Sequence, residues 1–422
     1  MRLNVTSEIG RLKSVLVHLP GREIDLMVPP MMAQLLFDDI LYGQVAREEH
    51  RRFQQLIRFV ADEVLDLQDL LEEVLEDDDV KNHIVRDLGK RNRLKRKLVA
   101  ELLEQKPAAL AEVLIAGIAR ETESGELPQF DLYPIPNLFF MRDPQIVLGD
   151  RVVVSAMATQ ARRRESLLSK YVFENHPHFR RDDIFWVDFM ENEPERPMSR
   201  KTPTLEGGDV LVPRRDLLLV GVTERTSKSG VEALMRSLKE SNAGVKSVII
   251  VDVPRQRSFM HLDTIFTFIS RHECLIYPPV ILPSGSQAAT VTTVDLTKKK
   301  GLAYSGQKSL LGALKKKGFD LEPIYCGGKS AVDQQREQWT DGANAFALAP
   351  GIILLYERNV KTAEALSKHG YHIVYEDDLL LGRTELETWT NKKYALQIAG
   401  NELSRARGGP RCMTMPLERE EL

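Results

Sequence analysis

Cysteine is scarce in this chain of 422 residues, which contains only Cys274, Cys326 and Cys412. These three residues form neither a pair nor a spacing typical of metal ligands. Sparse, unpaired cysteine is typical of proteins from a reducing compartment. We therefore expect no disulfide framework and a cytoplasmic location.

The chain also lacks long apolar runs and an excess of positive charge. The apolar run within residues 1–21 is too short for a secretory signal, and no later run reaches the length of a membrane-spanning helix. Lysine and arginine number 58 against 61 aspartates and glutamates, for a net charge of -3. Nucleic-acid binders are usually clearly basic. We expect neither a membrane nor a nucleic acid as a partner.

The remaining composition is that of an ordinary globular protein, with 43% hydrophobic and 28% charged residues. Residues 12–19 predict a strand, and residues 46–63 repeat apolar side chains at helical spacing. From residue 122 onward predicted strands alternate with predicted helices, too irregularly for a simple βαβ barrel and without a recognisable sequence repeat. No glycine-rich phosphate loop occurs. These patterns predict an α/β protein.

Residues 69–121 differ from the rest because they are almost wholly helix-forming, with an acidic block at 72–79 and a basic block at 91–97. Such blocks are usually solvated helix faces, and the basic block lacks the interleaved aromatic residues of a nucleic-acid site. A partner-binding surface is the alternative. We interpret residues 69–121 as an all-helical insertion in an α/β domain formed by residues 1–68 and 122–422.

The loop at residues 407–416 places Cys412 just past two glycines and a proline, with Arg407 and Arg411 nearby. Glycine and proline interrupt helices and strands, so we expect Cys412 on a flexible turn. Positive charge lowers the pKa of a thiol and favours the reactive thiolate. Taken alone, the loop fits an unreactive cysteine in a tail better than a nucleophile.

Three further polar segments lie where predicted strands begin or end. Asp143 precedes a proline, and Glu206 precedes a Gly-Gly turn. His261 and Asp263, at i and i+2, point the same way if the segment is extended. Alone, the first segment fits a structural turn and the third a satisfied histidine. In the second, Glu206 and Asp209 flank the two glycines, which fits a structural turn and a site for a cationic ligand equally well. Together with Cys412 they fit a nucleophile–base pair, and several carboxylates facing one point need a cation to stay ionised. The combination predicts a cationic, electrophilic carbon as substrate, such as that of a guanidinium.

These segments resemble those of the arginine deiminases, members of the guanidino-group-modifying (pentein) superfamily. They occur in the family's order over almost the whole chain, and together they are specific although each is weak alone. The resemblance implies a five-bladed α/β propeller with approximate fivefold symmetry and an inserted helical bundle, which fits the insertion at 69–121. The matching segments are LLFDDI from Leu35, NLFFMRDP from Asn137, LEGGDV from Leu205, ERT from Glu224, MHLDT from Met260, REQWTDGAN from Arg336 and RGGPRCMTMP from Arg407.

The resemblance also implies roles for individual residues. Cys412 matches the nucleophile, His261 the general acid/base and Glu206 the carboxylate that supports the histidine. Asp143 and Asp263 match the pair that grips the guanidinium nitrogens. The matches for the rest of the substrate are Asn137, Arg162 and Arg225 around the α-carboxylate, the mobile loop residue Arg407, and the wall or backbone contacts Leu36 and Phe140.

The implied reaction is hydrolysis of L-arginine to L-citrulline and ammonia, through a covalent amidino (S-alkylthiouronium) intermediate on Cys412. No metal or other cofactor is expected, because covalent and acid–base catalysis divide the displacement into two easier steps. The expected partner is a small-molecule substrate, and we expect a homo-oligomer, either a dimer or a tetramer.

Two alternatives stay open. One is a related guanidine-modifying enzyme, either an amidinotransferase or a hydrolase of agmatine or dimethylarginine. The other is a non-catalytic arginine-binding protein on the same scaffold. One residue departs from the family pattern, since Arg411 stands where many relatives carry histidine. An added cation there is expected to favour the thiolate, and could also repel the incoming guanidinium. The segment 339–344 is assigned only a structural role.

Overall fold

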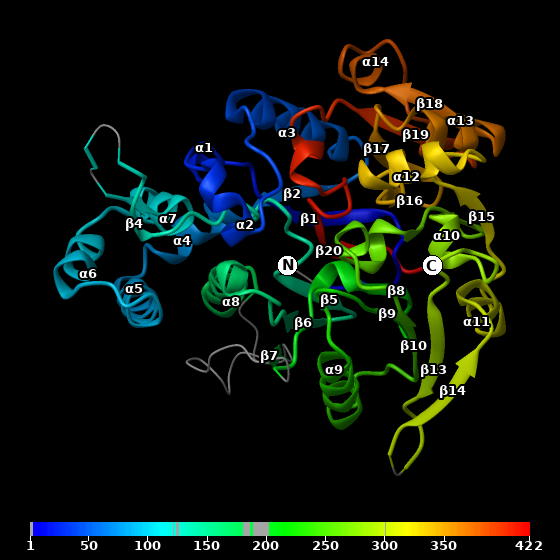
Figure 1. The fold of residues 1–422 in the computed structure, drawn as a ribbon, viewed down its shortest axis with the longest axis horizontal. Helices are drawn as coiled ribbons and strands as arrows, with labels where there is room; N and C mark the ends of the chain where they lie inside the picture. The colour runs from blue at the N-terminus through cyan, green and yellow to red at the C-terminus, as the bar shows by residue number, and fades with distance from the viewer. Residues whose placement is uncertain (1–2, 121, 124–125, 180–185, 189–201, 300) are drawn as a thin grey trace.

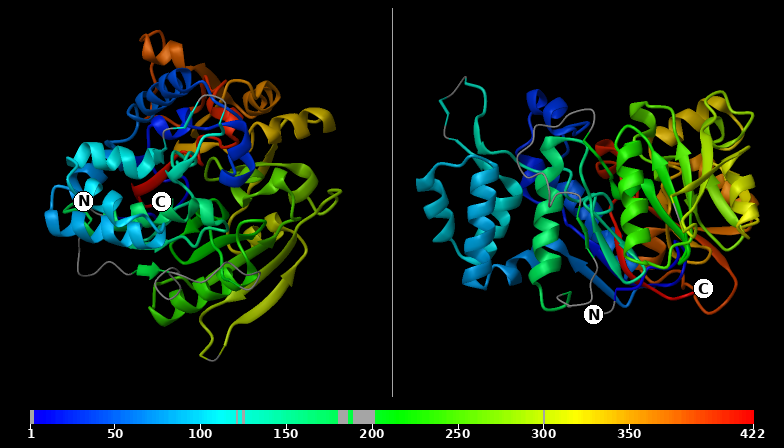
Figure 2. Two further views of the ribbon diagram at one scale, coloured as in Figure 1. Left: turned by 60° about the vertical axis from the view of Figure 1, so that its left-hand side comes forward. Right: turned by 90° about the horizontal axis from the view of Figure 1, so that it is seen from below.

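The computed structural model of the chain describes residues 3–120, 122–123, 126–179, 186–188, 202–299 and 301–422. Sheets and helices alternate along most of the chain, as the α/β prediction requires. Helices α4 to α7 lie at one end of the molecule and the hairpin of β13 (Thr290–Asp295) and β14 (Ala303–Gln307) lies at the other (Figures 1 and 2). Within the described residues, every helix is too short or too polar to cross a membrane.

Five of the described sheets contain the same three-strand pattern. A first strand pairs antiparallel with a central strand, and the central strand pairs parallel with a third. The five sets are β20 (Met415–Arg419), β1 (Leu12–Val17) and β2 (Glu63–Asp66); β5 (Gln145–Leu148), β6 (Arg151–Val154) and β7 (Trp186–Asp188); β8 (Val210–Arg214), β9 (Leu217–Val222) and β10 (Ser247–Asp252); β11 (Phe266–Phe268), β12 (Glu273–Ile276) and β15 (Glu322–Tyr325); and β16 (Phe346–Ala349), β17 (Ile352–Tyr356) and β19 (Lys393–Ile398).

The connections from central to third strand carry helices, because parallel neighbours need a crossover of a dozen residues or more. Phe53, Leu56 and Ile57 are buried on the inner face of the first crossover helix, as their helical spacing predicts. Strand β18 (Tyr371–Tyr375) and the pair β13–β14 extend two of the sheets. The crossover helices are α3 (Gly43–Ile57), α8 (Arg163–Asn175), α9 (Lys228–Glu240), α11 (Leu310–Lys316) and α13 (Val360–Lys368).

Four helices follow β2: α4 (Leu67–Val74), α5 (Asp78–Arg91), α6 (Arg96–Leu103) and α7 (Pro107–Ala116). They begin two residues before the segment predicted to be helical, 69–121, and residues 118–119 of that segment form a strand instead. The Asp66 and Asp77 carboxylates cap the first two, accepting hydrogen bonds from free backbone N–H groups. Helix α4 packs against α7 and α8, so the helices share one apolar cluster with β5 and β6. Most side chains of the acidic and basic blocks are exposed, as the interpretation of solvated helix faces predicts. A two-stranded sheet, β3 (Ile118–Ala119) with β4 (Phe130–Leu132), returns the chain to the body.

Each of the five first strands is preceded by a short turn that carries a buried polar residue. Asp143 precedes β5, Glu206 precedes β8, and the pair His261 and Asp263 precedes β11. Asn344 precedes β16, and Cys412 precedes β20. Glu206 and His261 each stand in extended conformation immediately before a 3-10 turn, Gly207–Asp209 and Leu262–Thr264. The same position in five sheets therefore supplies the residues of one site.

Candidate active site

The five turns meet at a small closed cavity of about 20 Å³. Nine of the eleven residues that the resemblance marks line it, and the other two, Glu206 and Asp263, lie in contact with His261 and Cys412 respectively. The structure therefore brings the whole predicted set together. The lining residues are Leu36, Asp38, Asn137, Phe140, Asp143, Arg162, Arg225, Met260, His261, Thr264, Ala406, Arg407 and Cys412.

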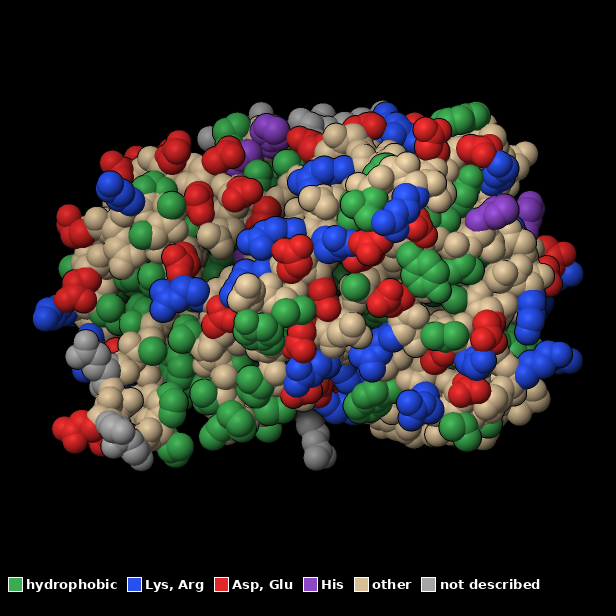
Figure 3. All heavy atoms as spheres, turned by 90° about the horizontal axis from the view of Figure 1, so that it is seen from above, with side chains coloured by type: hydrophobic (Ala, Val, Ile, Leu, Met, Phe, Trp, Pro, Cys, Tyr) green, Lys and Arg blue, Asp and Glu red, His purple; other side chains and the backbone are tan. Residues whose placement is uncertain are grey.

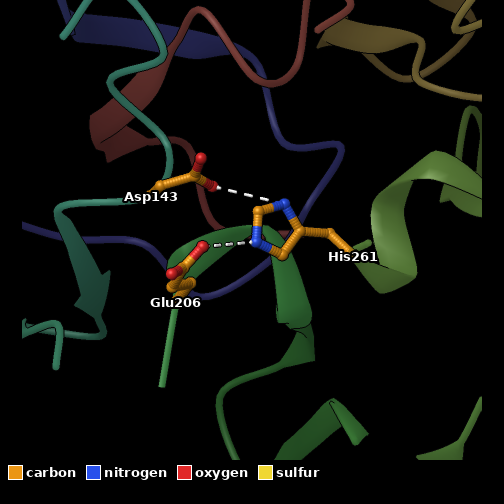
Figure 4. A group of neighbouring side chains, drawn as sticks. All are labelled: Asp143, Glu206 and His261. Atoms are coloured by element: carbon orange, nitrogen blue, oxygen red, sulfur yellow. Dashed lines mark hydrogen bonds and ion pairs between the residues drawn. The ribbon is translucent and has the colours of Figure 1, made fainter. Parts of the chain in front are cut away.

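His261 lies between two carboxylates (Figure 4). Its Nε2 is 2.8 Å from Oε2 of Glu206, and its Nδ1 is 3.6 Å from Oδ1 of Asp143. Burial opposes protonation of the ring, but the Asp143 and Glu206 carboxylates outweigh it and raise the pKa of His261 to about 10. At neutral pH the imidazole is a cation and both of its nitrogens carry protons. Such a group can give a proton to a leaving amine.

Glu206 is fully buried but remains ionised. Its Oε1 accepts a 2.9 Å hydrogen bond from the backbone N–H of Ala158. Burial raises its pKa, yet the hydrogen bond with His261 and the charges of Arg225 and Arg162 more than offset it and lower the pKa of Glu206 to about 2. A carboxylate this acidic orients the imidazole and stabilises its charge.

Asp209, which closes the same Gly-Gly turn, was not predicted as a site residue. Its Oδ1 accepts a 2.8 Å hydrogen bond from the backbone N–H of Leu262, and its Oδ2 accepts a 2.7 Å bond from the Thr223 hydroxyl. Burial raises the pKa of Asp209 to about 7. The residue ties the turn before β8 to the residue that follows His261, and so fixes where the histidine stands.

Asp143 and Asp263 both present carboxylates to this site, but they are engaged differently. Oδ1 of Asp143 accepts a hydrogen bond of 3.2 Å from the Gly208 N–H, and Oδ2 accepts one of 2.9 Å from Arg162. Oδ2 of Asp263 accepts a 2.8 Å bond from Arg411. Oδ1 of Asp263 is buried and has no hydrogen-bond partner among the described residues. A buried carboxylate oxygen without a donor is costly, which indicates a place reserved for a donor from a ligand.

Cys412 is almost completely buried, so it is neither an exposed cysteine nor part of a tail. Its Sγ is 3.9 Å from Oδ2 of Asp263, and its backbone N–H donates a 3.1 Å hydrogen bond to Oδ1 of Asn344. Burial, reinforced by the Asp263 and Asp143 carboxylates, raises the pKa of the Cys412 thiol well above its ordinary value. The expectation that neighbouring arginines favour the thiolate is therefore wrong for this state of the site.

The position of Arg411 explains why it does not lower the pKa of the Cys412 thiol. Its guanidinium does not line the cavity, because it is buried against Glu8 at 3.1 Å and Asp263 at 2.8 Å. A further hydrogen bond of 3.1 Å goes to the backbone carbonyl of Val210. Two carboxylates thus neutralise the cation, and repulsion of an incoming guanidinium by Arg411 is not expected.

The residues marked for a substrate carboxylate fall into two groups. Arg225 is buried, and its Nε and Nη1 have no hydrogen-bond partner among the described residues. Arg407 is equally buried, lacks hydrogen bonds at all three of its nitrogens within the described chain, and stacks on Trp339 with 3.5 Å from Cζ to the ring centroid. Two buried guanidinium groups with free donors are ready to bind an anion.

Arg162 belongs to the other group, because its donors are occupied. It donates to Glu165 through Nε and Nη2, at 2.8 to 3.1 Å, and to Asp143 through Nη1 at 2.9 Å. Asn137 likewise uses its side-chain amide, which donates a 2.8 Å bond to the Leu35 carbonyl at the end of α2 (Met32–Leu35). Contact of Arg162 with a substrate carboxylate would require it to release Asp143.

A metal cation is another candidate ligand of this cluster, since ligand atoms of Asp143, Glu206 and His261 all lie within 4.8 Å of one another. However, Nη1 of Arg162 already reaches Asp143 at 2.9 Å and Glu206 at 3.7 Å. The charge of these carboxylates is therefore already met by protein cations.

A family model described as arginine deiminase matches residues 33–419 of the chain. The chain belongs to the arginine deiminase family. It is 37% identical to an arginine deiminase of Clostridium perfringens (strain SM101 / Type A), over 100% of this chain and 98% of that protein. It is 33% identical to an arginine deiminase of Bacillus cereus (strain ATCC 10987 / NRS 248), over 100% and 99%.

Solved structures share the fold at much lower identity. One is an amidinotransferase of saxitoxin biosynthesis from Microseira wollei, with a TM-score of 0.55 and 13% identity, covering 100% of this chain and 98% of that chain. Another is the N-terminal domain of a cyanobacterial arginine dihydrolase, with a TM-score of 0.50 and 14% identity, covering 96% and 97%. These likenesses establish the α/β fold of the pentein superfamily for this member of the arginine deiminase family.

Asn344 and Glu8 are the main contributors that the sequence did not reveal. Asn344 accepts the Cys412 N–H and donates a 3.1 Å bond to the Asp263 carbonyl, so one amide side chain holds two turns of the site. Its segment was given only a structural role, but its place before β16 repeats that of Asp143 before β5. Glu8 lies far from every matching segment, and no local pattern marks it.

Proposed function

We propose that the chain hydrolyses L-arginine to L-citrulline and ammonia. The observation that carries the proposal is the unpartnered Oδ1 of Asp263, held 2.8 Å from Arg411 through its other oxygen and beside the Cys412 sulfur. A guanidinium nitrogen bound there lies next to the nucleophile, and the two Bacillus and Clostridium relatives are named arginine deiminases.

In this proposal the positive charge of the bound substrate promotes deprotonation of the Cys412 thiol. When the guanidinium binds Asp143 and Asp263, it neutralises two of the carboxylates that raise the pKa of Cys412. The thiol then loses its proton to solvent more readily, and the thiolate is formed next to the carbon that it attacks. The free protein keeps an inert thiol, and the complex holds a reactive one.

The first chemical step forms a bond between Sγ of Cys412 and the guanidinium carbon. His261, protonated and held by Glu206, gives a proton to one terminal nitrogen, and the carbon–nitrogen bond breaks to release ammonia. The product is an S-alkylthiouronium adduct on Cys412. Electrostatic support comes from Asp143 and Asp263, which hold the delocalised positive charge of the reacting group.

The second step hydrolyses the adduct. His261, now neutral, takes a proton from a water molecule, whose oxygen attacks the same carbon. The carbon–sulfur bond breaks, citrulline leaves, and Cys412 and protonated His261 are restored. The atoms balance as arginine plus water giving citrulline plus ammonia.

Substrate entry needs movement, because the closed cavity of about 20 Å³ is far smaller than arginine. We infer that Arg162 leaves Oδ2 of Asp143 as the guanidinium arrives and turns to the substrate carboxylate. Arg225 and Arg407 complete that anion site with their unpartnered donors. Arg407 has a positive φ of 64°, a backbone conformation that costs energy for a residue with a side chain.

We also infer a five-bladed α/β propeller, with residues 69–121 as a helical insertion in the domain of residues 1–68 and 122–422. The five repeated three-strand sets support the blades, and the pairing of β20 with β1 joins the last segment of the chain to the first. Residue 121, the last of the proposed insertion, lies outside the described part. Self-association into a dimer or tetramer, and a cytoplasmic location, stay predictions.

The deciding assay measures citrulline and ammonia from L-arginine with wild type and Cys412→Ser. Wild type should form both in equal amounts, and the variant should form neither. Agmatine, dimethylarginine and an amine acceptor are tested in parallel. Turnover of one of these in preference to arginine would favour the alternative enzymes, and binding of arginine without any turnover would favour an arginine-binding protein.

A further inference from the structure

A second cavity lies next to the active site but separate from it. Its volume is about 610 Å³, which is in the range of small-molecule sites. It opens between α5, α8 and the segment after β4. Apolar side chains form much of its wall, among them Leu35, Leu88, Met157 and Leu167, and Arg164 adds a charge to it.

Arg164 is the unusual feature of this cavity. The residue is only 8% exposed, yet its guanidinium makes a single hydrogen bond within the described chain, to the Tyr133 carbonyl. Its Nε has no partner there, and no described carboxylate forms an ion pair with it. The charge of the neighbouring Glu165 favours the cation but only partly offsets burial, because Glu165 is paired with Arg162. Burial lowers the pKa of Arg164 to about 10, so the group is still a cation at neutral pH. A buried charge without a counter-ion is costly unless a partner arrives.

Two other charged residues of the wall already have ion-pair partners, so they do not neutralise the charge of Arg164. Arg91 is bound by Asp87 at 2.7 Å, and Asp131 is bound by Arg120 at 2.6 Å. Thr159 also lines the cavity, and its hydroxyl is buried without a described partner. The wall also contains the cations Arg91 and Arg163 beside its apolar side chains. A buried cation and a hydroxyl with unused hydrogen-bonding capacity in such a wall are suited to bind an anion.

Helix geometry separates this cavity from the catalytic one. Arg162 ends the 3-10 turn Gln160–Arg162, and Arg164 lies in the first turn of α8, so the two side chains leave the chain in different directions. Arg162 accordingly reaches Asp143 in the active site, whereas Arg164 reaches Tyr133. Leu35 and Leu36 divide in the same way, one lining each cavity. The two cavities have no lining residue in common, although neighbouring residues of the same segments line one or the other.

We propose that the 610 Å³ cavity binds a small organic anion, with its phosphate or carboxylate group on Arg164 and its apolar part against Leu88, Met157 and Leu167. The site is independent of the proposed reaction. An anion supplies the counter-charge that Arg164 lacks, and the apolar wall excludes water from that pair.

The test is isothermal titration calorimetry of the full chain with phenyl phosphate, benzoate and inorganic phosphate. Phenyl phosphate or benzoate should bind, and the preferred one identifies the head group. Arg164→Gln should weaken that binding about tenfold or more, since hydrogen bonds to charged groups contribute about 1.5–3 kcal/mol. Arg236→Gln, which removes an exposed charge on α9, is the matched control and should change nothing.

Two controls keep the result specific to this cavity. Titration of Cys412→Ser saturated with L-arginine should leave the binding in place, because the probe and the substrate occupy different cavities. If Arg164→Gln does not fold, as judged by circular dichroism, Asn92→Trp fills the exposed rim with every charge kept and should also abolish binding. The proposal would be overturned if none of the three probes bound, or if arginine displaced the probe fully. Binding by the Arg164 or Asn92 variant equal to that of wild type would overturn it as well.

Discussion

Arg411 and Asp263 form a buried ion pair, with 2.8 Å between Nη1 of the arginine and Oδ2 of the carboxylate. The arginine directly precedes Cys412 in the chain, and Asp263 follows His261 by two residues. One pair therefore fixes the turn of the sulfur relative to the turn of the histidine. On its other side Arg411 is held by Glu8 at 3.1 Å, which ties the site to the start of the chain.

The ion pairs of Arg411 with Glu8 and Asp263 predict how substitutions change the free energy of unfolding. Arg411→Gln leaves Glu8 buried without its partner, and removal of one member of a buried ion pair typically costs about 3–5 kcal/mol. The double variant with Glu8→Gln should recover part of that loss, because no uncompensated carboxylate remains. Urea unfolding of the two single variants and the double variant measures the coupling. Additive losses would show that the two residues do not interact.

The pH dependence of the same pair has a definite sign. Burial raises the pKa of Glu8, but the Arg411 charge more than offsets it and holds that pKa below the ordinary range of a glutamate. The contribution of Glu8 to the free energy of unfolding is therefore complete above roughly pH 5 and is lost as the pH falls through the folded-state pKa. Unfolding of wild type and Glu8→Gln, compared between pH 7 and pH 3, should converge as the pH falls. Parallel curves would contradict the assignment.

Glu206 should control the protonation of His261. With Glu206→Gln the pKa of His261 should fall from about 10 toward the ordinary range, since one of the two flanking charges is gone. NMR titration of the His261 ring measures this directly. In wild type the ion pair's contribution to stability is complete below about pH 6.5 and is lost as the pH rises through about 10, because the folded-state pKa is the raised one. An unchanged titration in the variant would exclude this role of Glu206.

Asp263 should hold the Cys412 thiol protonated in the free protein. Asp263→Asn removes a carboxylate 3.9 Å from the sulfur, so the thiolate should appear at lower pH even though turnover of arginine is lost. Thiolate absorbance at 240 nm against pH, with Cys412→Ser as the background, checks the shift. Thiolate forming only at higher pH than in wild type would contradict it.

Cys412 should be the sole residue trapped during turnover. Cys274 and Cys326 are fully buried, and burial raises the pKa of both thiols far above the ordinary value. Rapid acid quenching with labelled arginine, followed by mass spectrometry, should place the amidino adduct on Cys412 alone. Label on Cys274 would refute the assigned nucleophile.

Arg225 and Arg407 should matter only for substrates with a carboxylate. Replacing either with glutamine should reduce kcat/KM for L-arginine by about 10- to 100-fold, the loss of a charge-assisted hydrogen bond, and should change agmatine use far less. Trp339→Leu should act like a mild Arg407 change, because it removes the ring under that guanidinium, whereas Trp339→Phe should keep most of the activity. Equal losses with both substrates would exclude carboxylate binding.

The surface is consistent with a site of this kind rather than with a polyanion-binding protein. On the face drawn in Figure 3, basic and acidic side chains are interspersed over the described residues, in keeping with the net charge of -3. The positive charge that the proposed mechanism needs is instead buried, on Arg162, Arg225 and Arg407.

Much of the architecture follows from local sequence. The periodicity of residues 46–63 corresponds to α3, although that helix ends at Ile57 and Glu63 begins β2. The strand predicted at residues 12–19 corresponds to β1. Short strands such as β5 and β11, of four and three residues, were not predicted because so few residues cannot display a period. The three-strand pattern was not visible as a sequence repeat, because backbone pairing repeats here while side-chain identity does not. Only the family resemblance implied a fivefold repetition.

The sequence by itself determined the family, and it marked residues that the structure brings together in one candidate site, because each lies in a short segment whose order along the chain is distinctive. The tertiary structure alone decided how those residues are charged and paired. Burial and the Asp263 carboxylate raise the pKa of Cys412, and Glu8 draws Arg411 away from the cavity. Arg162 and Arg164, which belong to one stretch of three consecutive arginines, line different cavities. Charge, pKa and direction depend on distances between segments hundreds of residues apart, and no local pattern contains those distances.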